Sequence, residues 1–460
     1  MMSKKDRASH NNSCYWSADG THLPEIQPHT KIKHQVLGDY TQRWVETLTG
    51  HGKYGVRTVT LVDGFCGGGM YTDGNQLWEG SSLRMIRKVE EGLRNVQERK
   101  PYQELDVKFI FIDNDPDHTA CLNLQLKNAG FENYIESGKC EIITGNFHEK
   151  LDYCLHRIIE RKGHSFFFLD PFGLDITPEI VKKIIDLGRS EVLFNHMLSG
   201  LVRILGRRDD PIYQNFLKEF GVDDYYNNIP DSKDFQHRQG YLRDQVLKLF
   251  REKGNAQILH TFALIKDRQS VYYYLIHASS NATALSVMKD TTWLQNNLEY
   301  QFHYGVYGIG YRTYDDLVKN FRIFDVNKQN REYCVNRLNE QLIKFIYEND
   351  NISFNFKELF NKTLQENPAT KLMYVDAVNY LLDDGEILVM RNGKITTSRS
   401  IQPKDIIMKA KHKQTILFND YGVKPVNRRE KKHHKKATKK TNSVVSDSKQ
   451  LNLFDRLTGD

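Results

Sequence analysis

One stretch near the start of the chain limits the folds that the sequence can adopt. An apolar run from Val59 to Val62 leads into Asp63, and the next residues read Gly64-Phe65-Cys66-Gly67-Gly68-Gly69. A buried parallel strand that delivers a ligand to a backbone loop has this form. Glycines let such a loop adopt positive φ and let a cofactor lie against the main chain. The stretch completes neither a dinucleotide nor a P-loop fingerprint, so a nucleotide-like ligand and a glycine-rich hairpin turn both stay open.

Length and composition indicate a soluble protein of two domains with tails. The chain has 460 residues, 39% of them hydrophobic and 27% charged, and no apolar run is long enough to span a bilayer. Residues 1–13 are polar and no apolar segment follows them, so we expect no signal peptide and a cytoplasmic protein. The six cysteines are far apart and form no Cys-x-x-Cys, which argues against a zinc site or a disulfide framework.

Hydrophobic strands alternate with helical periodicity through the first two thirds of the chain. This alternation predicts an α/β fold, a doubly wound Rossmann-like sheet, for a domain over residues 29–300 that follows an irregular lead-in over residues 1–28. Two further apolar stretches, 257–264 and 271–276, predict an antiparallel pair at the edge of the sheet. The predicted parallel strands after the first are 107–113, 141–147, 165–169 and 189–195.

Polar side chains at the ends of the second and third strands suit an adenosine-like ligand. Asp113 ends its strand where a carboxylate could accept two hydrogen bonds from a ribose diol. Asn146 could bind an adenine amino group while Phe147 stacks or packs nearby, but Asn146 is equally suited to cap the next helix. Lys31, on the first turn of a helix predicted over residues 30–48, is either a solvated basic residue or a contact to a cofactor carboxylate or substrate.

The most specific motif follows the fourth strand and reads Asp170-Pro171-Phe172-Gly173. It places an acceptor oxygen, a rigid turn and a flat ring at the carboxyl end of the sheet, where open α/β folds bind ligands. Alkylation of an exocyclic amine needs these parts. The carboxylate or the proline carbonyl accepts hydrogen bonds from the NH2 group, and the aromatic ring stacks on an unpaired base.

A second domain over residues 331–400 follows a connector over residues 301–330. Three helical segments, the second capped by Ser353, precede a hairpin whose turn is Asn392-Gly393, which predicts a winged helix-turn-helix. Such a module contacts nucleic acid or protein, or serves only in packing or dimerisation.

The last segment, residues 401–460, becomes basic and then rich in Ser, Thr and Asn from about Pro425, so we expect a largely disordered tail. Its lysines could neutralise phosphates or could only keep the chain soluble. Near its end lies a short apolar cluster that resembles the bacterial sliding-clamp-binding pentapeptide Gln-Leu-x-Leu-Phe. This cluster consists of Gln450, Leu451, Asn452, Leu453 and Phe454.

Taken together, residues 28–300 resemble the three-Cys-motif partner protein (TcmP) family. The resemblance lies in the Asp63–Gly69 stretch, the strand that ends at Asp113 and the Asp-Pro-Phe-Gly quartet. It also lies in the first predicted helix, with Lys31, Tyr40 and Trp44. It implies a class I methyltransferase fold with S-adenosylmethionine as cofactor, and a protein partner with a three-cysteine, radical-SAM-like motif. The quartet is also similar to that of tRNA guanine 2-amino dimethyltransferases. It is more loosely similar to the Asn/Asp-Pro-Pro-Tyr motif of adenine amino methyltransferases, whose second proline is replaced by Phe172.

The leading hypothesis is a methyltransferase that acts on an exocyclic base amine of DNA or RNA, with Asp170, Pro171 and Phe172 as catalytic residues. The alternative is a non-catalytic DNA-repair or defence factor that recruits an iron-sulfur partner or the sliding clamp. The predicted cofactor-binding residues are Lys31, Asp63, Phe65, Gly67, Gly69, Asp113, Asn146 and Phe147.

Overall fold

The computed structural model describes ten ranges of the chain, which fall into two compact units. The first unit comprises residues 1–338 and 361–374, and the second comprises residues 339–360 and 375–460. The basic tail from residue 411 and the clamp-like cluster at residues 450–454 lie outside the described residues, as does most of the connector. The described ranges are 15–50, 55–206, 211–222, 225–226, 229–230, 235–265, 271–298, 309–313, 326–349 and 353–410.

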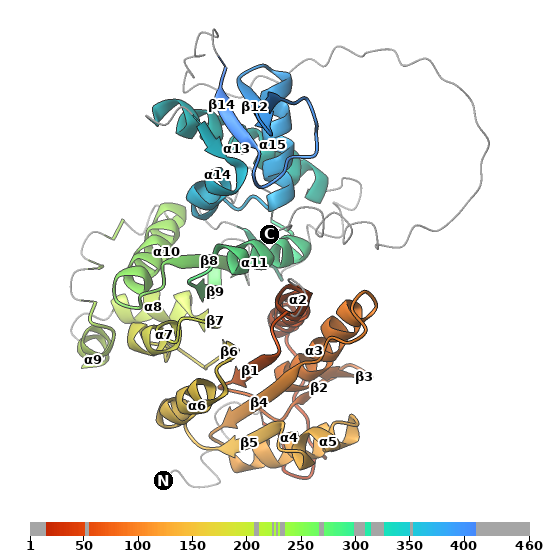
Figure 1. Cartoon of the computed structure of the whole chain (residues 1–460). Coiled ribbons are helices and arrows are strands. Elements are labelled where there is room, and N and C mark those ends of the chain that lie inside the picture. Colours follow the sequence, from red (N-terminus) through yellow and green to blue (C-terminus); the bar gives the residue numbers. More distant parts are fainter. Residues whose placement is uncertain are drawn as a thin grey trace. The chain divides into compact units, whose positions relative to one another are not determined.

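An eight-stranded sheet forms the centre of the first unit (Figure 1). Its strand order is β10-β8-β9-β7-β6-β1-β4-β5, and β9 alone among these strands runs antiparallel to its neighbours. The strands are β1 (Thr58–Asp63), β4 (Asp106–Asp113), β5 (Cys140–Thr144), β6 (His164–Leu169), β7 (Ser190–His196), β8 (Ile258–Ile265), β9 (Val271–Ser279) and β10 (Ile309–Arg312).

This order is that of the class I methyltransferase sheet, with β10 as an additional edge strand. One half of the sheet consists of the parallel strands β1, β4 and β5, and the other half begins with the parallel strands β6 and β7. The reversed β9 is inserted between β7 and β8. The predicted fold class is therefore confirmed. The predicted antiparallel pair lies inside the sheet rather than at its edge, because β10 pairs in parallel with β8.

Helices cover both faces of this sheet (Figure 1). Helices α2 and α3 lie on one side, and α6 and α7 lie on the other. Alternating residues of each strand therefore face two different hydrophobic layers. The helices of this unit are α2 (Pro28–Gly50), α3 (Ser81–Gln97), α4 (Pro116–Asn128), α5 (Glu132–Glu136), α6 (Phe147–Arg161), α7 (Pro178–Ile185), α8 (Leu198–Leu205), α9 (Pro211–Phe220), α10 (Phe235–Glu252) and α11 (Ala282–Gln295).

Two segments near β1 pack against each other. The polar stretch after the glycines forms a hairpin of β2 (Met70–Asp73) and β3 (Gln76–Glu79). Part of the lead-in is tied to this hairpin through a bridge between Glu25 and Thr72. The described part of the lead-in, residues 15–27, is thus packed onto the domain although it has almost no regular secondary structure.

The C-terminal helices and strands form a winged arrangement with a four-stranded sheet, in the order β11-β14-β12-β13. The predicted hairpin is present, and its turn residues Asn392 and Gly393 have φ values of 50° and 76°. The sheet continues past the boundary expected at residue 400. The elements are α13 (Val326–Glu348), β11 (Ser353–Asn355), α14 (Phe356–Thr363), the 3-10 helix η1 (Leu364–Glu366), α15 (Lys371–Asp383), β12 (Ile387–Arg391), β13 (Lys394–Ile395) and β14 (Ile406–Lys409).

Pairing between distant segments explains one departure from expectation in this region. Ser353 does not cap a helix, because it begins β11 and pairs with Met408 of β14. Asn355 takes the capping role, since its side-chain oxygen accepts a hydrogen bond of 2.8 Å from the Glu358 amide.

Within the described residues, no helix combines the length and the apolar character needed to cross a membrane.

Candidate functional site

Three carboxylates lie at the carboxyl ends of three adjacent parallel strands. Asp113 ends β4, Asp63 ends β1, and Asp170 directly follows β6. Side chains alternate along a strand, and these acids share the face of Leu61, Phe111 and Phe168. They therefore lie on the face of the sheet that is covered by α2 and α3, at the edge where open α/β sheets bind ligands.

Asp63 organises the loop rather than facing solvent. Its side chain is fully buried and accepts a hydrogen bond of 3.2 Å from the Phe65 amide and one of 3.4 Å from the Ser82 hydroxyl. Burial raises the pKa of Asp63 to about 7, although hydrogen bonds from Ser81 and Phe65 act in the opposite direction. Asp63 thus positions the backbone on which a ligand would lie.

The glycines after β1 allow close packing by a residue that sequence reasoning missed, Trp16. Gly67 and Gly69 have positive φ values of 56° and 81°. A Cβ atom on Gly67 would lie 2.9 Å from the Trp16 ring, and one on Gly68 would lie 2.2 Å from Trp16 Cγ. Trp16 is 4% exposed and donates a hydrogen bond of 2.5 Å from Nε1 to the Met70 carbonyl. A ligand of this loop must therefore lie along the side of the backbone that Trp16 leaves open.

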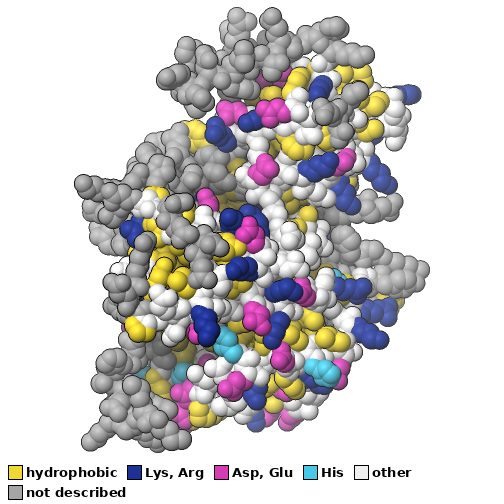
Figure 2. Space-filling view, turned by 90° about the vertical axis from the view of Figure 1, so that its left-hand side faces the viewer, with side chains coloured by type: hydrophobic (Ala, Val, Ile, Leu, Met, Phe, Trp, Pro, Cys, Tyr) yellow, Lys and Arg dark blue, Asp and Glu magenta, His cyan; other side chains and the backbone are white. Residues whose placement is uncertain are grey.

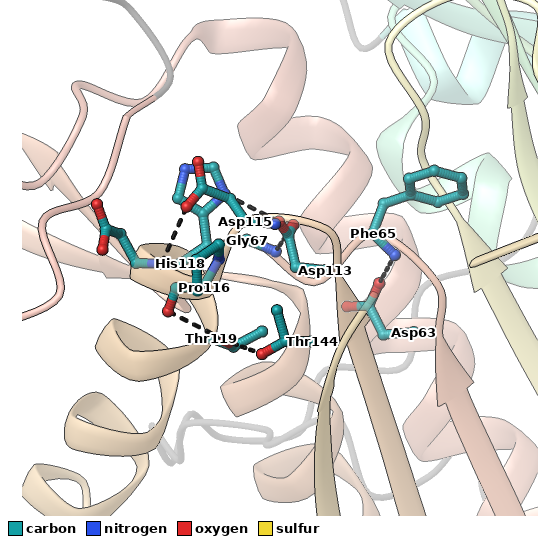
Figure 3. A network of polar contacts seen from close by, with 10 residues as sticks. Asp63, Phe65, Gly67, Asp113, Asp115, Pro116, His118, Thr119 and Thr144 are labelled. Carbon is teal, nitrogen blue, oxygen red and sulfur yellow. Dashed lines mark hydrogen bonds and ion pairs between the residues drawn. The ribbon is translucent and has the colours of Figure 1, made fainter. Parts of the chain in front are cut away.

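Asp113 is joined to the same loop by a polar network (Figure 3). Its Oδ2 accepts a hydrogen bond of 3.0 Å from the Gly67 amide, and its Oδ1 accepts one of 2.9 Å from the Asp115 amide. His118 Nδ1 lies 3.0 Å from the same Oδ1. Asp115 in turn caps α4 by accepting from the Asp117 amide at 2.9 Å. The network fixes the strand-end carboxylate directly beside the glycine-rich backbone.

The Asp113 carboxylate keeps about one acceptor position for a hydroxyl of a bound ligand. A carboxylate offers about four acceptor positions, and three protein donors contact this one. Its side chain is 12% exposed, in contrast to the fully buried Asp63. Of the two carboxylates, Asp113 is therefore the one with exposed surface.

The other predicted cofactor residues are more dispersed. Asn146 caps α6, since its Oδ1 accepts a hydrogen bond of 2.8 Å from the His148 amide. Phe147 is 2% exposed and packs 5.6 Å from the Phe65 ring, measured between ring centroids, in the hydrophobic layer on the α6 side. Lys31 forms an ion pair of 2.5 Å with Asp73 of the β2–β3 hairpin. The structure brings together Asp63, Gly67 and Asp113, whereas Lys31 and Phe147 point elsewhere.

A lysine from α2 holds the predicted catalytic acid. Lys33 Nζ lies 2.5 Å from Asp170 Oδ2 and 4.9 Å from the centroid of the Tyr273 ring. The Lys33 and Asp170 side chains are 7% and 17% exposed, so little solvent screens this pair. The pairing of Lys33 with Asp170 spans 137 residues and has no local signal in the sequence.

The remaining residues of the quartet have contrasting environments. Pro171 is buried, whereas 80% of the Phe172 surface is exposed. An exposed ring next to a half-buried carboxylate can stack on a flat ligand that enters from solvent.

Comparisons with known proteins are informative for the C-terminal part of the chain. Residues 313–393 match the family described as GMT-like wHTH domain. No curated protein sequence matches the chain.

Solved structures of methyltransferases are similar to parts of the chain at low identity. The O-methyltransferase from Bacillus cereus in complex with SAH shows 12% identity, covers 58% of this chain and 98% of its own, and has a TM-score of 0.26. Trm1 from Pyrococcus horikoshii with S-adenosyl-L-methionine shows 11% identity, coverage of 59% and 61%, and a TM-score of 0.30. The plantazolicin methyltransferase BpumL with SAH shows 10% identity, coverage of 55% and 86%, and a TM-score of 0.22. At these scores the fold assignment rests on the strand order itself.

Charge alone does not mark a binding surface on the face shown in Figure 2. There the Lys and Arg side chains of the described residues are interspersed with Asp and Glu side chains. Evidence for a ligand therefore comes from the side chains at the carboxyl edge of the sheet.

Proposed function

We propose that this protein is an S-adenosylmethionine-dependent methyltransferase that modifies an exocyclic amine of a nucleic-acid base. One observation carries the proposal. The glycine-rich loop of β1 lies between Asp113 of β4 and the Asp170 quartet after β6, on adjacent parallel strands. A cofactor held by the loop and Asp113 would thus lie next to a substrate held by Asp170.

The cofactor would be held mainly by the loop and Asp113. The Asp113 carboxylate would accept a hydrogen bond from one hydroxyl of the ribose diol, and the backbone at Gly67 and Gly69 would lie against the methionine moiety. Asn146 would contact the adenine, with Phe147 packed behind Asn146. Lys31 would have to break its ion pair with Asp73 to reach the cofactor carboxylate. S-adenosylmethionine supplies an activated methyl group on a sulfonium.

The Asp170 quartet would orient the substrate. The Asp170 carboxylate or the Pro171 carbonyl accepts hydrogen bonds from the amine, and Phe172 stacks on the base. Lys33 keeps the carboxylate in place through its ion pair. Because the methyl group is already activated, alignment of the amine can supply much of the rate without a strong general base.

The C-terminal match supports nucleic acid as the substrate. Helix-turn-helix modules place a helix in a DNA groove and contact phosphates on either side, and residues 313–393 match a domain of this kind. A three-Cys-motif protein and a sliding clamp bound through residues 450–454 belong to the proposal as partners, as does a cytoplasmic location.

A methyl-transfer assay tests the proposal. The full-length protein is incubated with methyl-labelled S-adenosylmethionine and separate pools of single- and double-stranded DNA and RNA. The proposal predicts label in nucleic acid with the wild type, loss of label with Asp170→Ala, and retention of label with Asp175→Ala, which alters an acid in the same loop. Equal transfer by Asp170→Ala, or label on none of the pools, would contradict the proposal.

A further inference from the structure

Two buried polar side chains near Asp170 have no role in the site described so far. They are Asn195 on β7 and Tyr273 on β9. Both strands contribute residues to the sheet face that is covered by α2, where Glu191 and His277 contact Tyr40. Residues 191 and 195 share one face of β7, and residues 273 and 277 share one face of β9, because side chains alternate along a strand. Asn195 and Tyr273 therefore lie on the same face as Asp170.

Asn195 is the register neighbour of Asp170. The last registered pair between β6 and β7 is Leu169 with Phe194, so Asp170 and Asn195 follow side by side on adjacent parallel strands. Asn195 is 4% exposed, and among the described residues its Oδ1 has no hydrogen-bond partner. A buried acceptor without a partner among the described residues thus lies on the residue next to Asp170 in the register of the sheet.

Tyr273 is the second buried polar side chain near Asp170. It is 1% exposed, its ring lies beneath the Lys33 ammonium, and among the described residues its hydroxyl has no hydrogen-bond partner. Burial and the nearby Asp170 raise the pKa of Tyr273 well above its usual value. The hydroxyl therefore keeps its proton and can donate as well as accept.

An unpaired buried polar group costs about 1–3 kcal/mol of stability. Native proteins have few such groups, and each calls for an explanation such as a ligand or a catalytic role. Here two of them flank the carboxylate of the Asp170 quartet. Lys33 donates to Oδ2 of that carboxylate, so Oδ1 can accept from a substrate. Asp170, Asn195 and Tyr273 thus provide two acceptors and one hydroxyl on the same face of the sheet.

We propose that Asn195 and Tyr273 bind the substrate base, with Asn195 Oδ1 and Asp170 each accepting one N–H of the exocyclic amine. The Tyr273 hydroxyl contacts the ring nitrogen or carbonyl oxygen next to the amine. This assignment rests on the proposed function and narrows its substrate to unpaired bases that carry an exocyclic amine, namely adenine, cytosine and guanine. Two acceptors on the two N–H groups would also fix the direction of the nitrogen lone pair.

Binding and stability measurements on the same variants test this assignment. The variants are Asn195→Leu, which keeps the size of the side chain, and Tyr273→Phe, which removes only the hydroxyl. The probes are short oligothymidylates with one central adenine, cytosine or guanine, together with oligothymidylate itself, measured by fluorescence anisotropy, and a matching RNA series in oligouridylate. Neither thymine nor uracil carries an exocyclic amine.

The wild type should bind at least one amine-bearing strand more tightly than the plain strand. Each variant should lose about 5- to 10-fold in affinity for that strand, the loss expected for one hydrogen bond, with unchanged affinity for the plain strand. The melting temperature of both variants should stay the same or rise, because each removes a polar group that has no partner in the part of the chain that the structure describes. Tyr226→Phe is the matched control, since its hydroxyl is also buried without a partner among the described residues, but its ring packs near Phe216 in the core. It should leave binding unchanged.

The outcomes separate this assignment from the proposed function. If the wild type prefers an amine-bearing strand and both variants keep that preference, the assignment of Asn195 and Tyr273 is wrong while the proposed function stands. If either variant lowers the melting temperature by several degrees, the side chain has a structural partner and its assignment is likewise overturned. If the wild type binds no strand, or binds all strands equally, the proposed substrate is wrong, and so is the assignment of Asn195 and Tyr273.

Discussion

The ammonium of Lys33 lies 2.5 Å from the carboxylate of Asp170, and the two side chains are 7% and 17% exposed. This ion pair connects α2 to the carboxyl end of β6. Removal of one member of a buried pair leaves the other charge uncompensated, which is far more costly than loss of a solvated pair. The pair therefore links the stability of this edge of the sheet to the state of the proposed catalytic acid.

Lys33→Met should lower the free energy of unfolding by about 3–5 kcal/mol. Lys31→Met, two residues away, should lower it by at most about 1 kcal/mol, because the Lys31 and Asp73 side chains are 29% and 34% exposed. Urea denaturation measures both. Asp170→Asn removes the uncompensated charge, so the cost of Lys33→Met should largely disappear in the double variant. Equal costs for the two lysine variants would contradict this account of the pair.

Trp16 and Gly68 should show strong energetic coupling. A Cβ atom on Gly68 would lie 2.2 Å from Trp16 Cγ, so Gly68→Ala must displace the ring. Trp16→Ala alone should cost about 3–5 kcal/mol, as expected for a buried aromatic side chain. In the Trp16→Ala background, Gly68→Ala should cost about 1 kcal/mol or less, since the clash is gone. A double-mutant cycle by urea denaturation tests this, and additive costs would show that Trp16 does not pack on the loop.

Asp63 should make stability depend on pH. Its pKa is about 7 in the folded protein and 3.8 without burial. Between these values the unfolded chain releases a proton that the folded chain keeps, so the contribution to stability is largest below about pH 4 and is lost as the pH rises to about 7. The loss approaches about 1.4 kcal/mol per pH unit within that window.

Asp63→Asn should abolish this slope while retaining an acceptor for the Phe65 amide. The measurement is the difference in unfolding free energy between wild type and variant from about pH 5 to pH 8. A difference that shifts steadily in favour of the variant as the pH rises, and then levels off, is expected. A constant difference would show that Asp63 is ionised in the fold throughout this range.

Lys289 should stabilise the segment between η1 and α15 through its hydrogen bonds. It is 1% exposed and donates to the carbonyls of Leu364, Asn367 and Ala369. Lys289→Met leaves these acceptors without their donor and should cost about 3 kcal/mol. Lys248→Met is the control, since the exposed Lys248 lies 3.9 Å from Glu252 and its loss should cost less than about 1 kcal/mol. Similar melting temperatures for both variants would argue against a structural role for Lys289.

The sheet and its strand-end acids could be predicted from the sequence because their signal is local. Apolar runs that stop at Asp63, Asp113 and Asp170 appear in the structure within one or two residues of their expected bounds. The hairpin turn at Asn392-Gly393 was equally predictable, since few residues adopt positive φ there.

Contacts between distant segments could not be predicted in this way. Trp16 packs on a loop about fifty residues later, and no periodic pattern marks it. Ser353 looked like a helix cap because its strand partner, Met408, lies in a segment that reads as part of the tail. Asn195 is the last residue of the predicted strand 189–195, but only the fold shows that its buried oxygen has no partner among the described residues.

The central claim is that Asp113 and the glycine-rich loop bind S-adenosylmethionine, and calorimetry of cofactor binding tests it most directly. The wild type should bind, and Asp113→Asn should bind at least about 10-fold more weakly because the ribose loses a charged acceptor. Asp115→Asn should bind like the wild type, since asparagine also caps a helix and Asp115 faces the Asp117 amide. Absence of binding by the folded wild type at millimolar cofactor, or equal affinity in Asp113→Asn, would contradict the account.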